Sequence, residues 1–245
     1  MNLLQGTRLI LAALCLAALG SCASIATLDS KSDATLKAMS DKLAAADQLS
    51  FTAYRQMDSR LKELPNQMTN ATIEAHVARP DRAKAIAKGG GDERHLYLAK
   101  EGGAIFSPKT GFYARFNGFP TVEQSIDKIS SELDIHVPMQ DFLGSNPYRN
   151  FRANSDTITH EGVDKIGGVA CDHLKGTRAE LEWHLWIAQS DNLPRRATIT
   201  VKEFSGKDHW KADFKKWNLN PKLPAGTFEF TPPKGATEID IVVAE

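Results

Sequence analysis

The chain has few cysteines, three in 245 residues. Cys15 and Cys22 lie in the N-terminal segment that has the form of an export signal, which leaves Cys171 as the one cysteine of the remaining sequence. No internal disulfide can form once Cys22 is acylated or removed, so a disulfide framework is excluded as the source of stability. Cys171 lies in a strand-like run, where we expect a small buried side chain rather than a reactive thiol.

The chain also lacks an excess of either charge: 30 lysines and arginines balance 30 aspartates and glutamates. A nucleic-acid binder needs a basic surface to displace counterions, so no nucleic-acid partner is expected, although a local charged patch is compatible with these counts. No internal repeat, low-complexity tract or linker divides residues 33–245, which we therefore interpret as one domain. A chain of this length can bury roughly 70% of its unfolded surface and needs no disulfide or metal ion to hold its fold.

The N-terminus has the pattern of a secretory signal, which we assign to residues 1–22. Arg8 precedes an apolar run, residues 9–19, that is too short to span a bilayer comfortably. Leu19-Gly20-Ser21-Cys22 resembles a bacterial lipobox, in which the cysteine is acylated and becomes the mature N-terminus. The alternative is ordinary cleavage near Ala23, which would release a free periplasmic or secreted protein. Acylation of Cys22 would anchor the protein to a membrane.

After a polar linker, residues 23–32, the chain changes from helical to strand periodicity. Asp33 opens a predicted amphipathic helix whose Leu36, Met39 and Leu43 share one face. Period-2 alternation then predicts an antiparallel meander with regular turns, typical of a sandwich, barrel or part-barrel. Its expected strands are 49–58, 68–79, 83–88, 94–99, 104–107 and 112–116.

Two helices are expected to interrupt the strands. Thr121-Val122-Glu123-Gln124 is a capping box that predicts a helix start, with Ile126, Ile129 and Leu133 on one face. A second short helix is expected from Pro138 to Gly144. Both should cover one side of the sheet.

The strongest strand signal is the hairpin at residues 180–203. Leu181, Trp183, Leu185 and Ile187 alternate with polar neighbours before a Ser-Asp-Asn-Leu-Pro turn. The other strands expected in this half are 156–161, 162–166, 169–175, 209–217 and 227–230, with a tight turn at Gly167-Gly168.

Several motifs now allow a family comparison. Phe228-Glu229-Phe230-Thr231-Pro232-Pro233-Lys234-Gly235 resembles the C-terminal pattern of the LolA/LolB-like lipoprotein-carrier superfamily, and Leu185-Trp186-Ile187 before Leu193-Pro194-Arg195 resembles its hairpin. A closer resemblance is to a family of predicted periplasmic proteins within that group. The motifs that carry it are Val77-Ala78-Arg79-Pro80-Asp81-Arg82, Ser107-Pro108 before Tyr113, Phe142-Leu143 before Asn146-Pro147-Tyr148, and Gly168-Val169-Ala170-Cys171-Asp172-His173-Leu174.

The resemblance implies a mainly β (α+β) fold: a strongly curved antiparallel sheet that forms an incomplete barrel. An N-terminal helix and the two inserted helices would cover its concave face. In the carriers that apolar concavity holds acyl chains, and no carrier residue is transferred to this chain. The residues expected to line the concavity here are Phe51, Ile73, Val77, Leu96, Leu98, Phe142, Leu143, Trp183, Leu185, Ile187, Ile199 and Val201. The same residues could equally form a dry core.

No catalytic, cofactor or metal site is expected. The seven histidines never occur at i,i+2 or i,i+4 spacing, so a zinc site would require convergence in space. His173 and His184 alternate with apolar neighbours, which predicts solvent exposure. No serine lies in a nucleophile-elbow setting. Trp186 and Trp210 are expected on the face opposite their more apolar neighbours, where one could meet a cavity, a partner or a bilayer surface.

These observations favour an exported, periplasmic or outer-membrane-associated protein without enzymatic chemistry. The first hypothesis is that it binds or carries a hydrophobic ligand, a lipid or lipoprotein acyl chain, in the concavity. The second is an interaction or envelope-sensor module, with the barrel filled by its own side chains and a protein partner on its outer face or edge strands.

Overall fold

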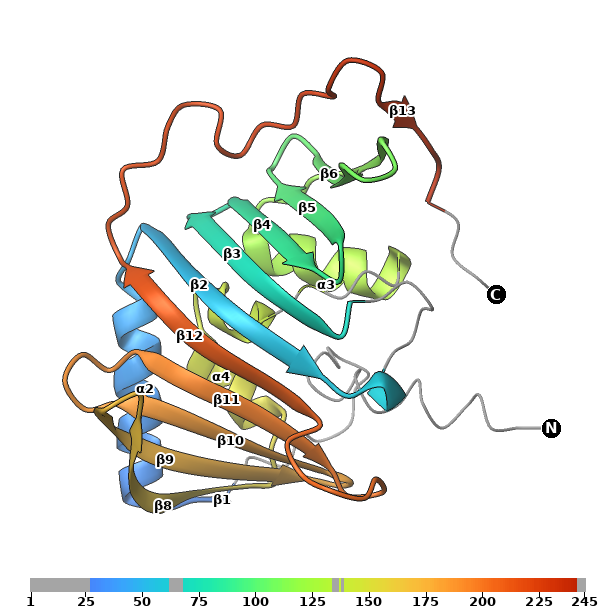
Figure 1. Ribbon diagram of the computed structural model, residues 1–245. Coiled ribbons are helices and arrows are strands. Elements are labelled where there is room, and N and C mark those ends of the chain that lie inside the picture. The colour runs from blue at the N-terminus through green and yellow to red at the C-terminus, as the bar shows by residue number, and fades with distance from the viewer. Residues whose placement is uncertain (1–26, 62–67, 134–136, 138, 242–245) are drawn as a thin grey trace.

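A computed structural model describes residues 27–61, 68–133, 137 and 139–241 of the chain. Its centre is one 13-stranded sheet in the order β1-β8-β9-β10-β11-β12-β2-β3-β4-β5-β6-β7-β13. The sheet is curved and open, because its terminal strands do not pair with each other, and helices lie against one side of it (Figure 1). The expected incomplete antiparallel barrel is confirmed.

The first described elements correct the expected linker. From Thr27 onward the segment 23–32 is not a linker: β1 (Thr27–Leu28) pairs in parallel with the start of β8, and helix α2 (Ser30–Ala44) follows at once. Asp29 is the N-cap, since its carboxylate accepts hydrogen bonds from the backbone N–H of Lys31 at 3.0 Å and Ser32 at 2.9 Å. The signal segment and Cys22 lie outside the described residues.

The first strand group is the expected meander. Its alternation places apolar side chains on the face that carries the helices. The elements are β2 (Gln48–Met57), η2 (Ser59–Leu61), β3 (Asn70–Ala78), β4 (Arg82–Gly89), β5 (Asp92–Leu98), β6 (Gly103–Ser107) and β7 (Phe112–Phe116).

Among the described residues, three helical elements rather than two separate the strand groups. Helix α3 (Val122–Leu133) starts where the capping box predicts, with Thr121 Oγ1 accepting from Gln124 N at 3.2 Å. The expected helix from Pro138 is reduced among the described residues to the 3₁₀ turn η3 (Gln140–Phe142), and Pro138 itself lies outside them. The third element, α4 (Pro147–Ala153), was not expected. Asn146 caps it and Pro147 takes the first helical position, where a missing N–H costs nothing.

The second strand group contains the strong hairpin. Strands β10 (Leu181–Ala188) and β11 (Pro194–Val201) pair as predicted, flanked by β9 (Val169–Arg178) and β12 (Trp210–Asn218). The two short strands expected at 156–161 and 162–166 are one strand, β8 (Thr157–Ile166). A bulge between His160 and Gly162 shifts its register.

The C-terminal strap, residues 219–241, runs from β12 along one end of the sheet to β13 (Thr237–Glu238), which pairs in parallel with β7 (Figure 1). The strand expected at 227–230 is absent, since those residues form turns and irregular backbone. Phe230 contacts the aromatic rings of Tyr97, Phe106 and Tyr113 at centroid distances of 5.4, 5.6 and 5.2 Å. Side-chain packing, not a ladder of backbone hydrogen bonds, therefore holds this motif.

The sheet joins both halves of the chain through β12 and β2, which pair in an antiparallel ladder. We call the side of the sheet that carries the helices its inner face and the other side its outer face. Leu36, Met39 and Leu43 of α2 and Ile126 and Ile129 of α3 belong to one buried cluster with the inner face. No helix among the described residues is long and apolar enough to cross a membrane.

Candidate functional site

The structure brings most of the expected lining residues together. Ten of the twelve belong to one buried cluster on the inner face: Phe51, Ile73, Val77, Leu96, Leu98, Phe142, Leu143, Trp183, Leu185 and Ile187. Ile199 is half-buried between this cluster and a smaller one, and Val201 belongs to the smaller one with Met57, Leu61 and Leu181. The side chains therefore face the inner side as predicted, and other parts of the chain cover them.

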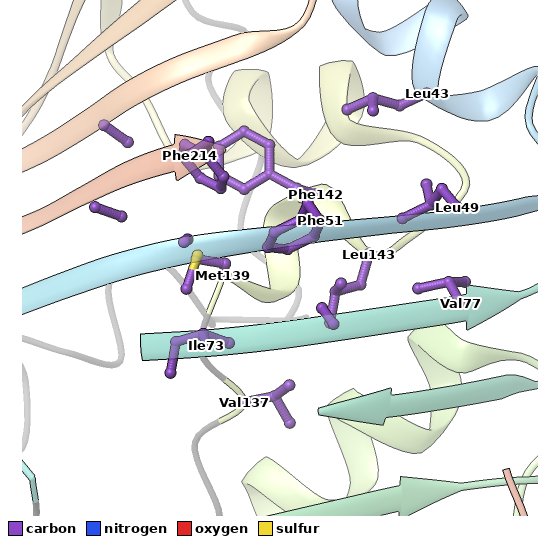
Figure 2. Close-up of a cluster of buried hydrophobic side chains, with 14 of the residues drawn as sticks. Leu43, Leu49, Phe51, Ile73, Val77, Val137, Met139, Phe142, Leu143 and Phe214 are labelled. Carbon is purple, nitrogen blue, oxygen red and sulfur yellow. The ribbon is translucent and has the colours of Figure 1, made fainter. Parts of the chain in front are cut away.

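The middle of the inner face is covered by the plug segment, residues 139–143. Figure 2 shows Phe142 directed toward Phe214 of β12, whereas Leu143 is directed toward β3. The Phe142 ring meets Phe214 of β12 edge-on, with centroids 4.9 Å apart, and Phe151 of α4 at 5.7 Å. Phe214 also contacts Phe51 at 5.6 Å. The plug segment thus covers the inner face with its own apolar side chains, Met139, Phe142 and Leu143.

The plug segment is held mainly by side-chain packing. The backbone N–H groups of Gln140, Phe142 and Leu143 donate to carbonyls within residues 137–140. Met139 has a positive φ of 59°, an uncommon conformation for a side-chain-bearing residue. The Asp141 side chain is half-buried, and burial raises the pKa of its carboxyl to about 7. A segment of this kind can leave the sheet without breaking a strand ladder.

Trp183 anchors the other side of the concavity. Its ring packs on Phe151 at a centroid distance of 5.1 Å, and its Nε1 donates to Ser155 Oγ at 3.0 Å. On the neighbouring strand Gly176 lies opposite Trp183, and a Cβ at that position would overlap the indole. Glycine is thus required here for the indole to lie flat against β9.

One inner-face residue that sequence reasoning did not single out is Arg55. It follows Phe51 and Ala53 in the alternation of β2, and that position is the signal that could have identified it. Its side chain is 7% exposed, and burial lowers the guanidinium pKa. Nη2 donates to the backbone carbonyl of Met68, whereas the buried Nε has no hydrogen-bond partner among the described residues. A cation therefore lies within an otherwise apolar face.

The outer face carries a histidine cluster that corrects a prediction. His173 and His184 are not solvent-exposed but half-buried: His173 Nε2 and His184 Nδ1 lie 2.7 Å apart. His173 also contacts Asp164 at 3.0 Å and stacks on Trp186 at a centroid distance of 4.3 Å. Adjacent strands bring the two rings together, which spacing in the sequence could not reveal. Within the described part of the chain, no group of three or more His, Cys, Asp or Glu side chains is arranged to hold a metal ion.

Trp210 also differs from expectation. It lies between Ile199 and Met57 of the adjacent strands and packs against both apolar clusters, so it belongs to the inner face. Trp186 does lie on the outer face, where its Nε1 donates to Asp164 at 2.9 Å. The prediction therefore placed Trp210 on the wrong face of its strand. Trp210, Ala212 and Phe214 follow one another at two-residue intervals along β12, so their side chains lie on the same face.

A cavity of about 520 Å³ lies under the C-terminal strap, away from the inner face. Residues 223–229 form one wall, and the opposite wall comes from the turns around Asp81, Arg82 and Glu101. None of the twelve expected lining residues borders it. Charges of both signs surround this cavity, so its chemistry differs from that of an acyl-chain site.

Known proteins resemble this chain in sequence pattern and in fold. A family model described as "Predicted periplasmic protein (DUF2092)" matches residues 32–242. An uncharacterized conserved protein from Thermus thermophilus is 11% identical, with a TM-score of 0.52 over 86% of this chain and 99% of that chain. MucB is 11% identical, with a TM-score of 0.51 over 83% of this chain and 64% of that chain. LprF from Mycobacterium bovis is 14% identical, with a TM-score of 0.48 over 85% and 99%.

At these identities the structural matches establish a shared fold and nothing further. The present chain spans just under two thirds of the MucB chain. No curated protein sequence matches it. Function must therefore be argued from the site.

Proposed function

This chain belongs to the DUF2092 family of predicted periplasmic proteins, and from that premise we propose that it binds or carries a hydrophobic ligand in the concavity of its half-barrel. Its periplasmic location agrees with the export signal predicted at residues 1–22. The proposed ligand is a lipid or a lipoprotein acyl chain, bound without chemical conversion. The alternative, an interaction module with a self-filled barrel, is developed below.

The observation that carries this proposal is the plug segment over the inner face. Phe142 and Leu143 cover apolar strands through side-chain contacts, and the backbone hydrogen bonds among residues 137–143 are local. An acyl chain could replace the ring and methyl contacts that these residues make, at about 25 cal/mol per Å² of apolar surface kept from water. A ligand would exchange with the plug segment without disrupting the sheet, since β2 and β12 remain paired.

Arg79 makes a hydrogen bond to the plug segment that would have to break if this segment moved away from the sheet. Its Nη1 donates to Leu143 O at 2.9 Å, and its Nε and Nη2 donate to Ala46 O and Leu43 O at the end of α2. Arg79 therefore connects the plug segment to the first helix and to β3. Outward movement of the plug segment would cost this one charge-assisted hydrogen bond, about 1.5–3 kcal/mol.

Native mass spectrometry of the protein expressed and exported in a bacterium tests the proposal. We expect a population with added mass that corresponds to a lipid, removable by delipidation. The delipidated protein should then bind methyl cis-parinarate, a fluorescent neutral acyl ester. Phe142→Ala should bind this probe more tightly because it removes the ring that fills the concavity. Phe112→Ala, at a position 46% exposed on β7, is the matched control and should bind as the wild type does.

Protein that is consistently empty and does not respond to acyl probes, in the wild type and in Phe142→Ala alike, would rule out the carrier. The alternative would then stand: the same half-barrel, filled by its own side chains, acts through its surface. One observation favours it, namely that the inner-face residues are already buried by the chain itself. In the described part of the chain β1 pairs only with the first two residues of β8, and the N–H of His160 is donated to Asp29. Beyond His160, β8 presents an edge to which a partner strand could pair.

Membrane anchoring through Cys22 is a separate part of the proposal. Its support is the lipobox-like sequence, since Cys22 lies outside the described residues. Metabolic labelling with a palmitate analogue should mark the wild type and not Cys22→Ala. An unlabelled wild type would instead support cleavage near Ala23.

A further inference from the structure

We propose that Arg55 is the recognition site for an anionic head group, a carboxylate or phosphate, on the hydrophobic ligand; this inference rests on the proposed function. The guanidinium lies on the inner face among apolar residues, in the row of β2 that also presents Phe51 and Ala53. It would pair with ligand oxygens while the acyl chain lies along the neighbouring apolar strands. The argument begins with the unused hydrogen-bonding capacity of this side chain.

A guanidinium has five N–H donors and is charged at every physiological pH. In Arg55, Nη2 donates to Met68 O, and Nε is buried without a partner in the described part of the chain. The pKa of Arg55 is lowered by burial, and no acid of the described residues opposes that effect. An unpaired charge removed from water is costly unless a counter-charge is supplied. The buried, unpartnered Nε is therefore a donor that an anionic group of the ligand could use.

Arg79 shows what a structural arginine looks like in the same protein. Its three nitrogens donate to three backbone carbonyls. Burial lowers the pKa of Arg79 as it lowers that of Arg55, but the charges of Glu123 and Asp47 oppose this effect and favour the cation. Arg79 is thus satisfied by the chain itself. Arg55 differs in both respects, because it uses one carbonyl and has no acidic neighbour within the described ranges.

The cross-strand neighbours of Arg55 have small side chains, and they are buried with it on the inner face. They are Ala71 on β3 and Ala212 on β12, and Ala212 in turn lies opposite Ala197 on β11. Ala71 and Ala212 flank Arg55 directly and Ala197 lies one strand further, so this row of the sheet places only methyl groups beside the guanidinium. A carboxylate or phosphate could approach the fork of N–H groups over these methyl groups, in the bidentate geometry that arginine favours.

The first measurement compares two probes on the delipidated wild-type protein: cis-parinaric acid, which carries a carboxylate, and its methyl ester. A charge-assisted pair contributes enough for the acid to bind at least about tenfold more tightly than the ester. Equal affinities would overturn the role of Arg55 while leaving the proposed function intact. Failure of both probes to bind would instead refute the proposed function, so the two failures are distinguishable.

The second measurement uses two variants. Arg55→Met keeps a similar side-chain length without the charge, and Arg55→Lys keeps the charge without the planar set of N–H donors of a guanidinium. In Arg55→Met the preference for the acid should fall to about equal affinity, with ester binding retained; an unchanged preference would overturn the proposal. In Arg55→Lys we expect an intermediate preference. Competition by oleate and by lysophosphatidylglycerol then identifies whether carboxylate or phosphate is the better head group.

A thermal melt of the delipidated proteins separates recognition from a structural role and does not depend on any probe. If Arg55 serves to bind a ligand, Arg55→Met should melt at the same temperature as the wild type or higher, because the substitution removes a buried unpaired charge. Arg79→Met should melt lower, since it removes three hydrogen bonds to backbone carbonyls. A fall for Arg55→Met as large as that for Arg79→Met would show that Arg55 is structural and would overturn the inference.

Discussion

The replacement Phe142→Ala gives the most direct test of the packing over the inner face. Phe142 is 3% exposed and is the ring through which the plug segment meets both β12 and α4. Truncation to alanine leaves a void between Phe214 and Phe151, two rings held by their own strand and helix. The void should close only in part, because β12 and α4, which carry those rings, are held by other contacts.

The size of the effect follows from area and cavity terms. A buried phenylalanine withdraws about 150 Å² from water, or about 4 kcal/mol at 25 cal/mol per Å². Alanine retains one methyl group, about 0.8 kcal/mol, so the transfer term is about 3 kcal/mol. The residual cavity adds to it, and we expect a loss of about 3 to 5 kcal/mol in the free energy of unfolding.

Urea denaturation followed by circular dichroism measures this loss, on delipidated protein so that bound lipid adds no stability. Phe112→Ala is the control for a half-exposed phenylalanine and should lose about 1 kcal/mol or less. A loss below about 1.5 kcal/mol for Phe142→Ala would refute the reasoning, since it would mean that the ring is not part of a packed core.

Three further predictions concern other parts of the molecule. Gly176→Ala should destabilise the protein by about 1 to 3 kcal/mol in the same urea assay, because the added methyl group overlaps the indole of Trp183; an unchanged midpoint would contradict this contact. The pKa of His173 is lowered first by burial and then by His184, so the unfolded chain takes up its proton at a higher pH than the folded protein does, and stability should fall as pH drops below about 6.5. His173→Gln should lose less stability than the wild type between pH 7 and pH 5, and parallel losses would exclude this histidine as the cause. Burial raises the pKa of Asp141 to about 7, so its ionisation opposes folding increasingly between about pH 4 and pH 7. Asp141→Asn should therefore melt higher than the wild type at pH 8 and equally at pH 4, and an equal melting temperature at pH 8 would argue against burial of that carboxyl.

Local patterns in the sequence predicted most of the elements. The hairpin at 180–203 and the start of α3 were both correct, because alternation over two strands and a capping box each depend on neighbouring residues alone. The helix α4 was missed, although Asn146 and Pro147 carry its start signal, because the pair also suits a lead into the next strand. A strand was expected at 227–230 because its phenylalanines alternate, yet Phe230 packs on the outer face without a ladder.

The candidate site was predicted in part. Alternation correctly assigned the apolar side chains to the inner face, because one face of each strand must be buried. It did not show that Phe142 meets Phe214, since 72 positions separate them in sequence and only the packing of the plug segment on β12 joins them. Arg55 was visible in the alternation of β2, but its burial and its unpaired Nε depend on what surrounds it.

The sequence by itself determined the family, the curved mainly β architecture and the face on which each strand's apolar residues lie. These features depend on short-range signals: side-chain periodicity, turn residues, caps and the order of motifs along the chain. Tertiary structure alone decided how far the concavity is filled, that His173 and His184 touch, and that the described chain leaves Arg55 without a counter-charge. Burial and pairing of polar groups are properties of the whole arrangement, because they depend on which distant segments cover a residue and on what those segments leave unsatisfied.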